Sequence, residues 1–256
     1  MRNPRVSAVL IVKNERENLA GLLPVLRPIV DEVVVVDDAS DDGTRDVARA
    51  FGCRVLHRRF DTFSRQRNYA LARASHDWIL SIDADERPSD GFGEELRRRI
   101  VDERFAAYRV RIRSSIFGRE FRFTGTQDDV PIRLFRRDEA AWIGDVHELL
   151  RVSGRTGRMR KGFSHRTHAS LHVYLSKLNR YAALEARTRV DSGVGPRGRD
   201  LWLAPPREVF RRLVWKGGFL DGPEAWAFSA LSGLCEWTIA MRHRAEWGRW
   251  KGEAMP

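Results

Sequence analysis

The order of strand-like and helix-like segments predicts an α/β fold with a mostly parallel central sheet. Apolar, β-branched runs at residues 6–12, 33–36, 54–57 and 78–82 alternate with helical patterns in the first hundred residues. Such alternation is typical of right-handed crossovers between parallel strands. Acidic side chains also follow two of these strands directly, and this class of fold binds ligands beyond the carboxyl ends of its strands.

The first strand and helix illustrate how each element is assigned. Residues 6–12 form an uninterrupted apolar run, as expected of a strand buried on both faces. Leucines at helical spacing follow in residues 19–26, where Pro24 predicts a short, kinked or shifted helix. After the second strand, a helix is expected from Thr44 to Phe51.

The ends of the next helices are set by short polar residues and glycine. We expect Ser40 or Asp41 to cap the helix that begins at Thr44, and Gly52 to end it. Residues 64–74 have a helical pattern. Another helix, capped by Ser89, places Phe92, Leu96 and Ile100 on one face.

From residue 106 the pattern changes to mixed strands and then to helices. Residues 108–112 alternate like a half-exposed strand, and residues 132–135 form another that would extend the sheet. The basic, glycine-containing stretch 151–166 predicts turns and a loop. Helical spacing returns from Ser170, and residues 205–250 predict one or two further helices.

Composition limits the possible partners and compartments. The 256 residues include 46 Lys and Arg against 35 Asp and Glu, a net charge of +11. This charge favours nucleic acid, an anionic membrane surface or a phosphorylated substrate. Cys53 and Cys235 form no CxxC pattern, so we expect a reducing compartment and neither a disulfide framework nor a zinc site. We also expect no signal peptide and no spanning helix.

Paired carboxylates after the fourth strand indicate a metal site. Asp83 and Asp85 are two residues apart on a segment expected to be extended, so their side chains should point the same way. Two converging carboxylates suit a hard divalent cation such as Mg²⁺. Such a cation stabilises the charge that develops on a departing diphosphate. A solvated acidic turn is the alternative.

A further carboxylate, Asp37, ends the second strand after four valines. There it can accept a hydrogen bond from N3–H of a uracil or from a ribose hydroxyl. The alternative is a capping role in the following residues 38–44.

Four sequence blocks, in this order and at this spacing, resemble glycosyltransferase family 2, whose members have the GT-A fold: VSAVLIVKNE, EVVVVDDASDDGT, SRQRNYAL and DWILSIDADE. Later blocks resemble the branch that contains lipopolysaccharide-core β-1,4-glucosyltransferases: IRLFRR, DVHE, YLSKLNRY and GGFLDG. The resemblance covers nearly the whole chain. It implies a catalytic domain over residues 1–165, with a nucleotide-sugar-binding half (1–104) and an acceptor-side half (105–165), and a helical region over 166–256.

The resemblance also implies roles for individual residues. The donor site would comprise Glu15, Asp37, Arg67, Asn68 and Asp83. A metal would be held by Asp83 and Asp85 of the DxD motif. His165 matches a histidine of the branch and would face the metal or the diphosphate, with a structural histidine as the alternative. A three-histidine zinc site with His168 and His172 is disfavoured. Ala39 and Pro24 depart from the family pattern.

Family members invert the anomeric centre in a single displacement, which requires a base for the acceptor hydroxyl. Glu148 of the VHE block is the expected base, Asp145 and Asp129 are its rivals, and the alternative is that Glu148 only pairs with an arginine. The implied reaction transfers a hexose, glucose, from a UDP-sugar to a cell-envelope glycan or lipid-linked acceptor such as lipopolysaccharide core, with Mg²⁺ or Mn²⁺. Guanine- and thymidine-linked donors remain open.

The basic C-terminal part predicts contact with a membrane. Four basic residues alternate with apolar ones, as in an interfacial amphipathic helix: Arg207, Arg211, Arg212 and Lys216. A core-packing helix is the alternative. We expect a cytoplasmic protein, peripheral on the cytoplasmic face of the inner membrane, where lipid-linked acceptors reside.

Two other classes of function are considered. A basic nucleic-acid-binding protein would explain the charge, but the acidic strand ends would repel phosphate, and the sequence has no zinc-finger spacing, RNP block or heptad array. A nucleotide-binding protein without transferase activity is opposed by the presence of Asp83, Asp85 and Glu148. We therefore expect an enzyme that does not bind nucleic acid.

Overall fold

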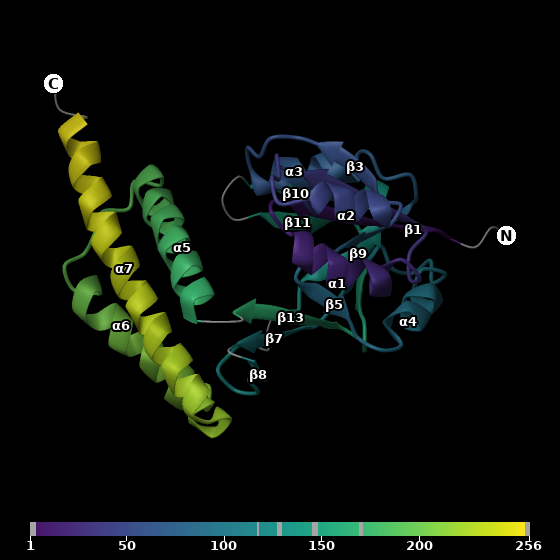
Figure 1. Cartoon of the computed structure of the whole chain (residues 1–256). Helices are drawn as coiled ribbons and strands as arrows, with labels where there is room; N and C mark the ends of the chain where they lie inside the picture. The colour runs from purple at the N-terminus through teal and green to yellow at the C-terminus, as the bar shows by residue number, and fades with distance from the viewer. Residues whose placement is uncertain (1–3, 117, 127–129, 145–147, 169–170, 254–256) are drawn as a thin grey trace. The chain divides into compact units, whose positions relative to one another are not determined.

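The computed structural model describes residues 4–253 except 117, 127–129, 145–147 and 169–170. The chain forms two compact units (Figure 1). The first comprises Met1–Arg113 and Asp129–His165, and the second comprises Ser114–Asp128 and Arg166–Pro256. Residues 114–128, which the sequence placed in the first domain, group with the second unit.

A seven-stranded sheet with the order β12-β6-β9-β4-β1-β2-β3 forms the centre of the first unit. β1 lies between β2 and β4 and is parallel to both, β3 is parallel to β2, and β9 runs antiparallel to β4 and β6. The strands of this sheet are β1 (Val6–Val12), β2 (Glu32–Asp37), β3 (Arg54–His57), β4 (Trp78–Ser81), β6 (Ala107–Arg109), β9 (Ile132–Arg136) and β12 (Thr156–Arg158). The predicted α/β fold with a mixed, mostly parallel sheet is confirmed.

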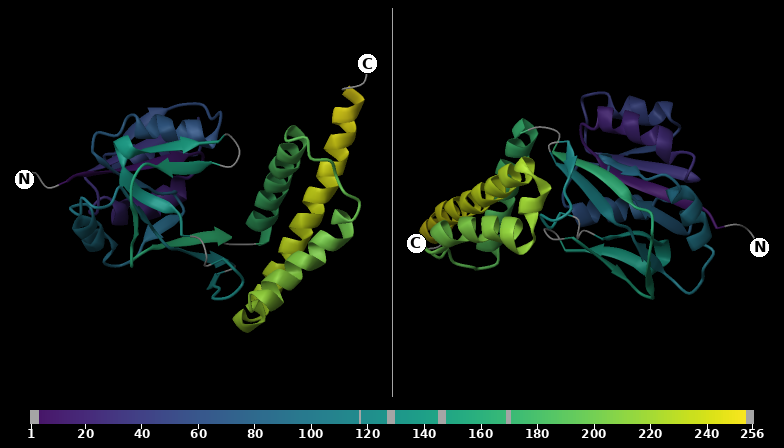
Figure 2. Two further views of the ribbon diagram at one scale, coloured as in Figure 1. Left: turned by 180° about the vertical axis from the view of Figure 1, so that it is seen from behind. Right: turned by 90° about the horizontal axis from the view of Figure 1, so that it is seen from below.

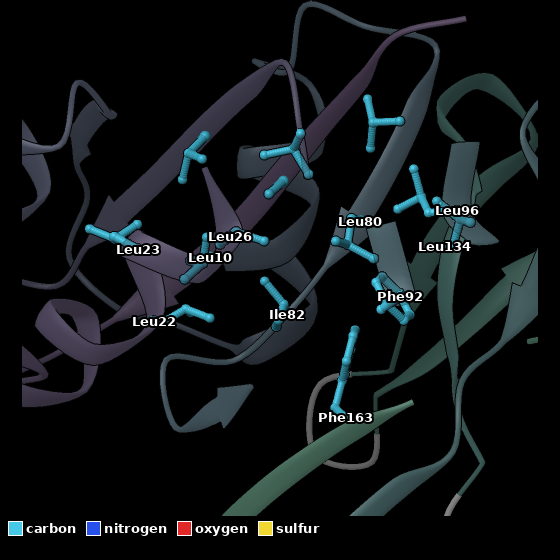
Figure 3. Packing of buried hydrophobic residues seen from close by; sticks show 14 of the residues in the cluster. Leu10, Leu22, Leu23, Leu26, Leu80, Ile82, Phe92, Leu96, Leu134 and Phe163 are labelled. Atoms are coloured by element: carbon cyan, nitrogen blue, oxygen red, sulfur yellow. The ribbon is translucent and has the colours of Figure 1, made fainter. Parts of the chain in front are cut away.

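Four helices accompany this sheet: α1 (Arg16–Leu26), α2 (Thr44–Ala50), α3 (Phe63–Leu71) and α4 (Phe92–Arg99). Successive strand side chains alternate between two hydrophobic clusters. One contains Leu10 and Leu80 with the leucines of α1 and with Phe92 of α4 (Figure 3). The other contains Val9 and Ile79 with the apolar side of α3. Each such buried leucine or phenylalanine contributes about 1.5–3 kcal/mol.

Two helix starts differ from the sequence prediction, whereas α1, which includes Pro24, ends at Leu26. The N-cap residue of α4 is Gly91 rather than Ser89. The N-cap residue of α2 is Gly43, with φ of 89°, rather than Ser40 or Asp41. Oδ1 of Asp42 accepts the N–H of Thr44 at 2.9 Å. α2 ends at Ala50 with Phe51 as its C-cap residue, and Gly52, with φ of 68°, follows at the predicted stop.

The first unit also contains short antiparallel pairs. β5 (Glu86–Pro88) pairs with β13 (Phe163–His168), and β10 (Ala140–Ile143), which follows the 3₁₀ turn η1 (Arg137–Glu139), pairs with β11 (Leu149–Val152).

The prediction that residues 151–166 form turns and a loop is wrong, because they contain β12 and the start of β13. Their glycines permit close approach instead. A Cβ atom on Gly157 would lie 2.7 Å from the ring of Tyr108, and one on Gly162 would lie 2.2 Å from the carbonyl oxygen of Arg111. The glycines thus allow these segments to lie against their neighbours.

The second unit is mainly helical. It contains most of β7 (Ile112–Ile116), β8 (Arg119–Glu120), α5 (Leu171–Asp191), α6 (Asp200–Phe210), the π-helical turn η2 (Arg211–Trp215), the 3₁₀ turn η3 (Gly218–Asp221) and α7 (Pro223–Glu253). α5 and α6 both lie along α7 (Figure 2). Phe121, Tyr174 and Phe228 belong to its core cluster. None of the described helices combines the length and the apolar character needed to cross a bilayer.

Candidate active site

The carboxyl ends of β1, β2 and β4 meet at one edge of the central sheet, because these strands are parallel neighbours. Asp37 is the last residue of β2, and Asp83 follows β4 after one intervening residue. The loop after β1 contains Glu15. The fold therefore brings residues from three separate segments to the edge where this class of sheet binds ligands.

Asp37 is fully buried. Its Oδ2 atom accepts the backbone N–H of Ser40 at 3.1 Å and lies 3.8 Å from both Nε of Arg45 and Nδ1 of His57. Its Oδ1 atom has no hydrogen-bond partner among the described residues. Buried polar atoms nearly always have a partner, so this acceptor suits a donor group of a ligand, such as a nucleobase N–H or a ribose hydroxyl.

The loops after β1 and β2 are joined by hydrogen bonds. The backbone N–H of Glu15 donates to Oγ1 of Thr44 at 2.8 Å, and that of Asn14 donates to Oγ of Ser40 at 2.9 Å. Asn14 and Ala39 both have left-handed backbones, with φ of 55° and 49°. A residue other than glycine in this conformation costs about 1–2 kcal/mol, a strain that often marks a functional loop.

The acidic segment after β4 is not extended, so that sequence prediction is wrong. Residues 83–86 form a turn in which the backbone N–H of Glu86 donates to the carbonyl oxygen of Asp83 at 3.0 Å. The carboxylate of Glu86 in turn accepts the backbone N–H of Asp83 at 2.9 Å. In such a turn, side chains two residues apart do not share one face as they do in a strand, and Asp83 and Asp85 have different partners.

Asp83 binds two arginines. Its Oδ1 atom lies 3.1 Å from Nη2 of Arg67, and its Oδ2 atom lies 2.8 Å from Nη2 of Arg133. Burial by itself raises the pKa of Asp83, but the two guanidinium groups outweigh it and hold the pKa well below its usual range. Asp83 is therefore ionised and oriented by cations from α3 and β9.

Arg133 was not among the site residues predicted from the sequence. This side chain is only 8% exposed and also donates to Oε1 of Glu86 at 2.6 Å. Burial is the main cause that raises the pKa of Glu86 to about 7. The available signal was the position of Arg133 between the apolar residues Ile132 and Leu134 of β9, because a charged side chain that is buried requires a partner of opposite charge.

Asp85 contacts His165, which is contributed by β13. Oδ2 of Asp85 lies 3.0 Å from Nε2 of His165. Burial lowers the pKa of His165, but its hydrogen bond to Asp85 and the neighbouring carboxylates outweigh this effect and raise it.

The donor atoms of Asp85 and His165 suit a divalent cation. Adjacent ligands on an octahedral ion with bonds of about 2.1 Å lie about 3 Å apart, the separation seen here. In the described part of the chain, no three His, Cys, Asp or Glu side chains form a complete metal site. A cation held by this pair would therefore need further ligands from substrate oxygens or water. The side chains of His168 and His172 lie outside the described residues.

Arg67 connects the acidic turn to Glu148. Its Nε atom lies 3.0 Å from Oε1 and 3.2 Å from Oε2 of Glu148, while Nη1 donates to Ser81 at 3.2 Å. The guanidinium also lies over the ring of Trp142, 4.9 Å from its centre. Asn68 fixes the backbone of Trp142, with hydrogen bonds of 2.8 and 3.0 Å.

Of the expected site residues, the structure thus joins Arg67, Asp83 and Glu148 in one ion-pair network. The rival bases Asp145 and Asp129 lie outside the described residues.

The sequence matches Glycosyl transferase family 2 over residues 7–163. The chain belongs to this family. The matched region spans the segments that contribute Glu15, Asp37, Arg67, Asp83 and Glu148, so the chain is a glycosyltransferase, as the resemblance implied.

Two relatives extend the similarity. The lipopolysaccharide core biosynthesis glycosyltransferase LpsC of Rhizobium meliloti is 28% identical over 251 residues, which cover 93% of each chain. An uncharacterized glycosyltransferase of Rickettsia typhi, RT0209, is 24% identical over 74% of this chain and 69% of its own. The first similarity includes the helical unit, because it covers nearly the whole of both proteins.

A solved structure supports the GT-A fold of this glycosyltransferase. The mannosyltransferase PcManGT of Pyrobaculum calidifontis, in complex with GDP-Man and Mn²⁺, is similar with a TM-score of 0.56. The similarity covers 95% of this chain and 88% of PcManGT, at 14% identity. The predicted GT-A fold is therefore confirmed.

Proposed function

We propose that this glycosyltransferase is an inverting hexosyltransferase that moves glucose from UDP to a cell-envelope glycan or lipid-linked acceptor, such as lipopolysaccharide core, with the aid of Mg²⁺ or Mn²⁺. The observation that carries the proposal is the ion-pair network in which Arg67 joins Asp83 to Glu148 at the carboxyl edge of the sheet. Its similarity to LpsC supports the acceptor class, and the GDP-Man and Mn²⁺ bound to PcManGT support the donor class and the cation.

The donor site is assigned from the strand ends. Asp37 would accept a hydrogen bond from uracil or ribose through Oδ1, which is buried without a partner among the described residues. Glu15 lies in the adjoining loop. Arg67, positioned by Asn68 through Trp142, would bind the diphosphate, because a guanidinium matches phosphate oxygens in both charge and geometry.

The metal site is assigned to Asp85 and His165, with Asp83 beside them in the same turn. When bound, a divalent cation supplies positive charge to the diphosphate oxygens as the leaving group departs. Asp83 is held in place beside this pair by its ion pairs with Arg67 and Arg133.

Glu148 is assigned as the base, with Asp145 and Asp129 as the alternatives. In the reaction, the acceptor oxygen forms a bond to the anomeric carbon while the bond from that carbon to the diphosphate oxygen breaks. The hydroxyl proton passes to Glu148, and the sugar inverts. The carboxylate is 23% exposed, so it is accessible to an acceptor while Arg67 orients it.

The proposal is tested by a donor screen. Purified protein is incubated with UDP-, GDP- and dTDP-hexoses and Mg²⁺ or Mn²⁺, and release of the nucleoside diphosphate is measured with and without a chelator. We expect chelator-sensitive release from UDP-glucose that increases with a lipopolysaccharide-core acceptor. Tight binding of UDP without any release or transfer would instead indicate a nucleotide-binding protein without transferase activity.

The proposed acceptor class also indicates where in the cell the protein would act. Lipid-linked acceptors are assembled at the cytoplasmic face of the inner membrane, and we propose that the protein acts there as a peripheral protein. The high basic charge of the chain, +11, supports attraction to an anionic surface.

A further inference from the structure

An exposed apolar surface lies on the second unit, along α6, η2 and η3. Trp202 and Trp215 are each 78% exposed, although tryptophan is a residue that proteins usually bury in large part. The surface, which we call the α6–η3 surface, consists of Trp202, Leu203, Phe210, Trp215, Phe219 and Leu220, each at least half exposed. Large apolar residues that cluster in this way mark interaction sites.

These side chains are not needed for the core of the second unit. α6 packs against α7 through its other side, where a Cβ atom on Gly233 would lie 2.8 Å from Val209 and 3.1 Å from the carbonyl oxygen of Pro205. In η2, Leu213 is buried while Trp215, two residues later, is exposed. The helix therefore has an inner face that is already packed and an outer apolar face.

Basic residues accompany this apolar surface. Residues 197–222 contain six basic and three acidic residues, a net charge of +3. Two of the acids are already engaged: Glu208 pairs with Arg211 and Arg212, and Asp221 accepts backbone N–H groups of residues 122–124. These pairs engage Arg211 and Arg212 as well, so it is the net charge of +3 that places positive charge beside the aromatic side chains of this segment.

A hollow of about 380 Å³ brings the two kinds of side chain together. It is lined by Arg207, Arg211 and Lys216, by the aromatic rings of Phe210 and Trp215, and by Glu208. Cations beside exposed aromatic rings match the headgroup layer of an anionic bilayer, where phosphate meets the start of the hydrocarbon.

We propose that the α6–η3 surface docks on an anionic phospholipid bilayer, with Trp202, Trp215 and Phe219 in the headgroup region and the basic hollow on a lipid phosphate. A second copy of the chain is the weaker alternative, because a two-fold interface through this surface would place its net charge of +3 against itself. The inference rests on the proposed function only for the identity of the acceptor. It specifies which surface of the second unit would hold the protein on the bilayer that contains this acceptor.

Vesicle sedimentation with the full chain tests this proposal. Vesicles of phosphatidylcholine alone are compared with vesicles that also contain phosphatidylglycerol. We expect binding that requires phosphatidylglycerol and decreases with salt. Trp215→Ser combined with Phe219→Ser should weaken the partition, and Arg207→Glu combined with Lys216→Glu should weaken it about tenfold or more. The matched control Arg151→Glu with Arg158→Glu, two exposed arginines of the first unit, should bind as the wild type does.

Thermal unfolding and nucleoside diphosphate release, measured in solution, show whether each variant is folded. Vesicle binding requires no turnover, so a failed donor screen and a failed docking proposal are separate outcomes. Equal binding to both kinds of vesicle, no binding, or loss of binding in the control would overturn the proposal. So would competition by inorganic phosphate at matched ionic strength, or a dimer in solution that Trp215→Ser dissociates.

Discussion

The Nε atom of Arg67 lies 3.0 Å from Oε1 of Glu148, although 81 residues separate them in the sequence. The same guanidinium binds Asp83 through Nη2 at 3.1 Å. One buried cation thus fixes the position of both the assigned base and an acid of the proposed donor site. The two interpretations of Glu148 made from the sequence, a base or an arginine partner, are compatible, because an ion-paired carboxylate that remains partly exposed can still accept a proton.

Glu148→Gln is expected to separate these two roles. Glutamine can still accept a hydrogen bond from Arg67 but is not a base, so kcat should fall by about 10²–10⁴-fold while the Kd for UDP changes little. Steady-state release of the nucleoside diphosphate and calorimetric titration with UDP measure the two quantities. Glu103→Gln, at an exposed position, is the matched control. If the Glu148→Gln variant has the kcat of the wild type, Glu148 is not the base and serves only to orient Arg67. Asp145 and Asp129 would then be the next candidates for the base.

Asp85→Asn is expected to weaken the use of metal. Asparagine keeps the size of the side chain but removes the charge that a divalent cation requires, so turnover should fall about 10²–10³-fold. The concentration of Mn²⁺ that gives half-maximal rate should also rise. Asp138→Asn, whose side chain is 82% exposed, is the control. The metal assignment fails if Asp85→Asn leaves the Mn²⁺ dependence unchanged.

Much of this site follows from sequence order, and the rest depends on contacts between distant segments. The buried run before Asp37 and the run before Asp83 predicted strand ends correctly, because β-branched runs between polar breaks have few alternative structures. Arg133 could not be assigned in this way. Its role depends on β9 pairing with β4 in an antiparallel register that brings it to Asp83 and Glu86, and periodicity does not determine register between distant strands.

The wrong predictions have related causes. Residues 83–85 were expected to be extended, but the carboxylate of Glu86 and a backbone hydrogen bond close a turn. Gly157 was interpreted as a loop residue, although its missing side chain makes room for Tyr108. In both cases the pattern of apolar and polar residues was compatible with two structures. Hydrogen bonds between Asp83 and Glu86 decided the first case, and the contact with the distant Tyr108 decided the second.

Glu95→Gln tests an electrostatic contribution to stability outside the site. The carboxylate of Glu95 accepts backbone N–H groups of Arg160 at 3.0 Å and Lys161 at 2.8 Å, and it pairs with Arg99. Burial raises the pKa of Glu95, but these donors outweigh it and lower the pKa below the ordinary value of 4.5. We expect the substitution to lower the free energy of unfolding by about 1–3 kcal/mol at pH 7.

The pH dependence of this effect has a definite sign. Because the pKa is lower in the folded state, the contribution of Glu95 is complete above about pH 4.5 and is lost as the pH falls through the folded value. Urea unfolding of wild type and Glu95→Gln should therefore differ most at neutral pH and converge in acid. A difference that is constant from pH 7 to below pH 4, or that grows in acid, would contradict the assignment.

Asp37→Ala tests nucleotide recognition. If Oδ1 of Asp37 accepts N3–H of uracil, wild-type protein should bind UDP at least about tenfold more tightly than N3-methyl-UDP, because a charged hydrogen bond contributes about 1.5–3 kcal/mol. Asp37→Ala should lose affinity for UDP and bind both nucleotides alike. If the partner is a ribose hydroxyl, 2′-deoxy-UDP should show this pattern instead. Asp41→Ala, an exposed acid of the adjoining loop, should retain the discrimination of the wild type. Unchanged UDP affinity in a folded Asp37→Ala variant would remove Asp37 from the donor site.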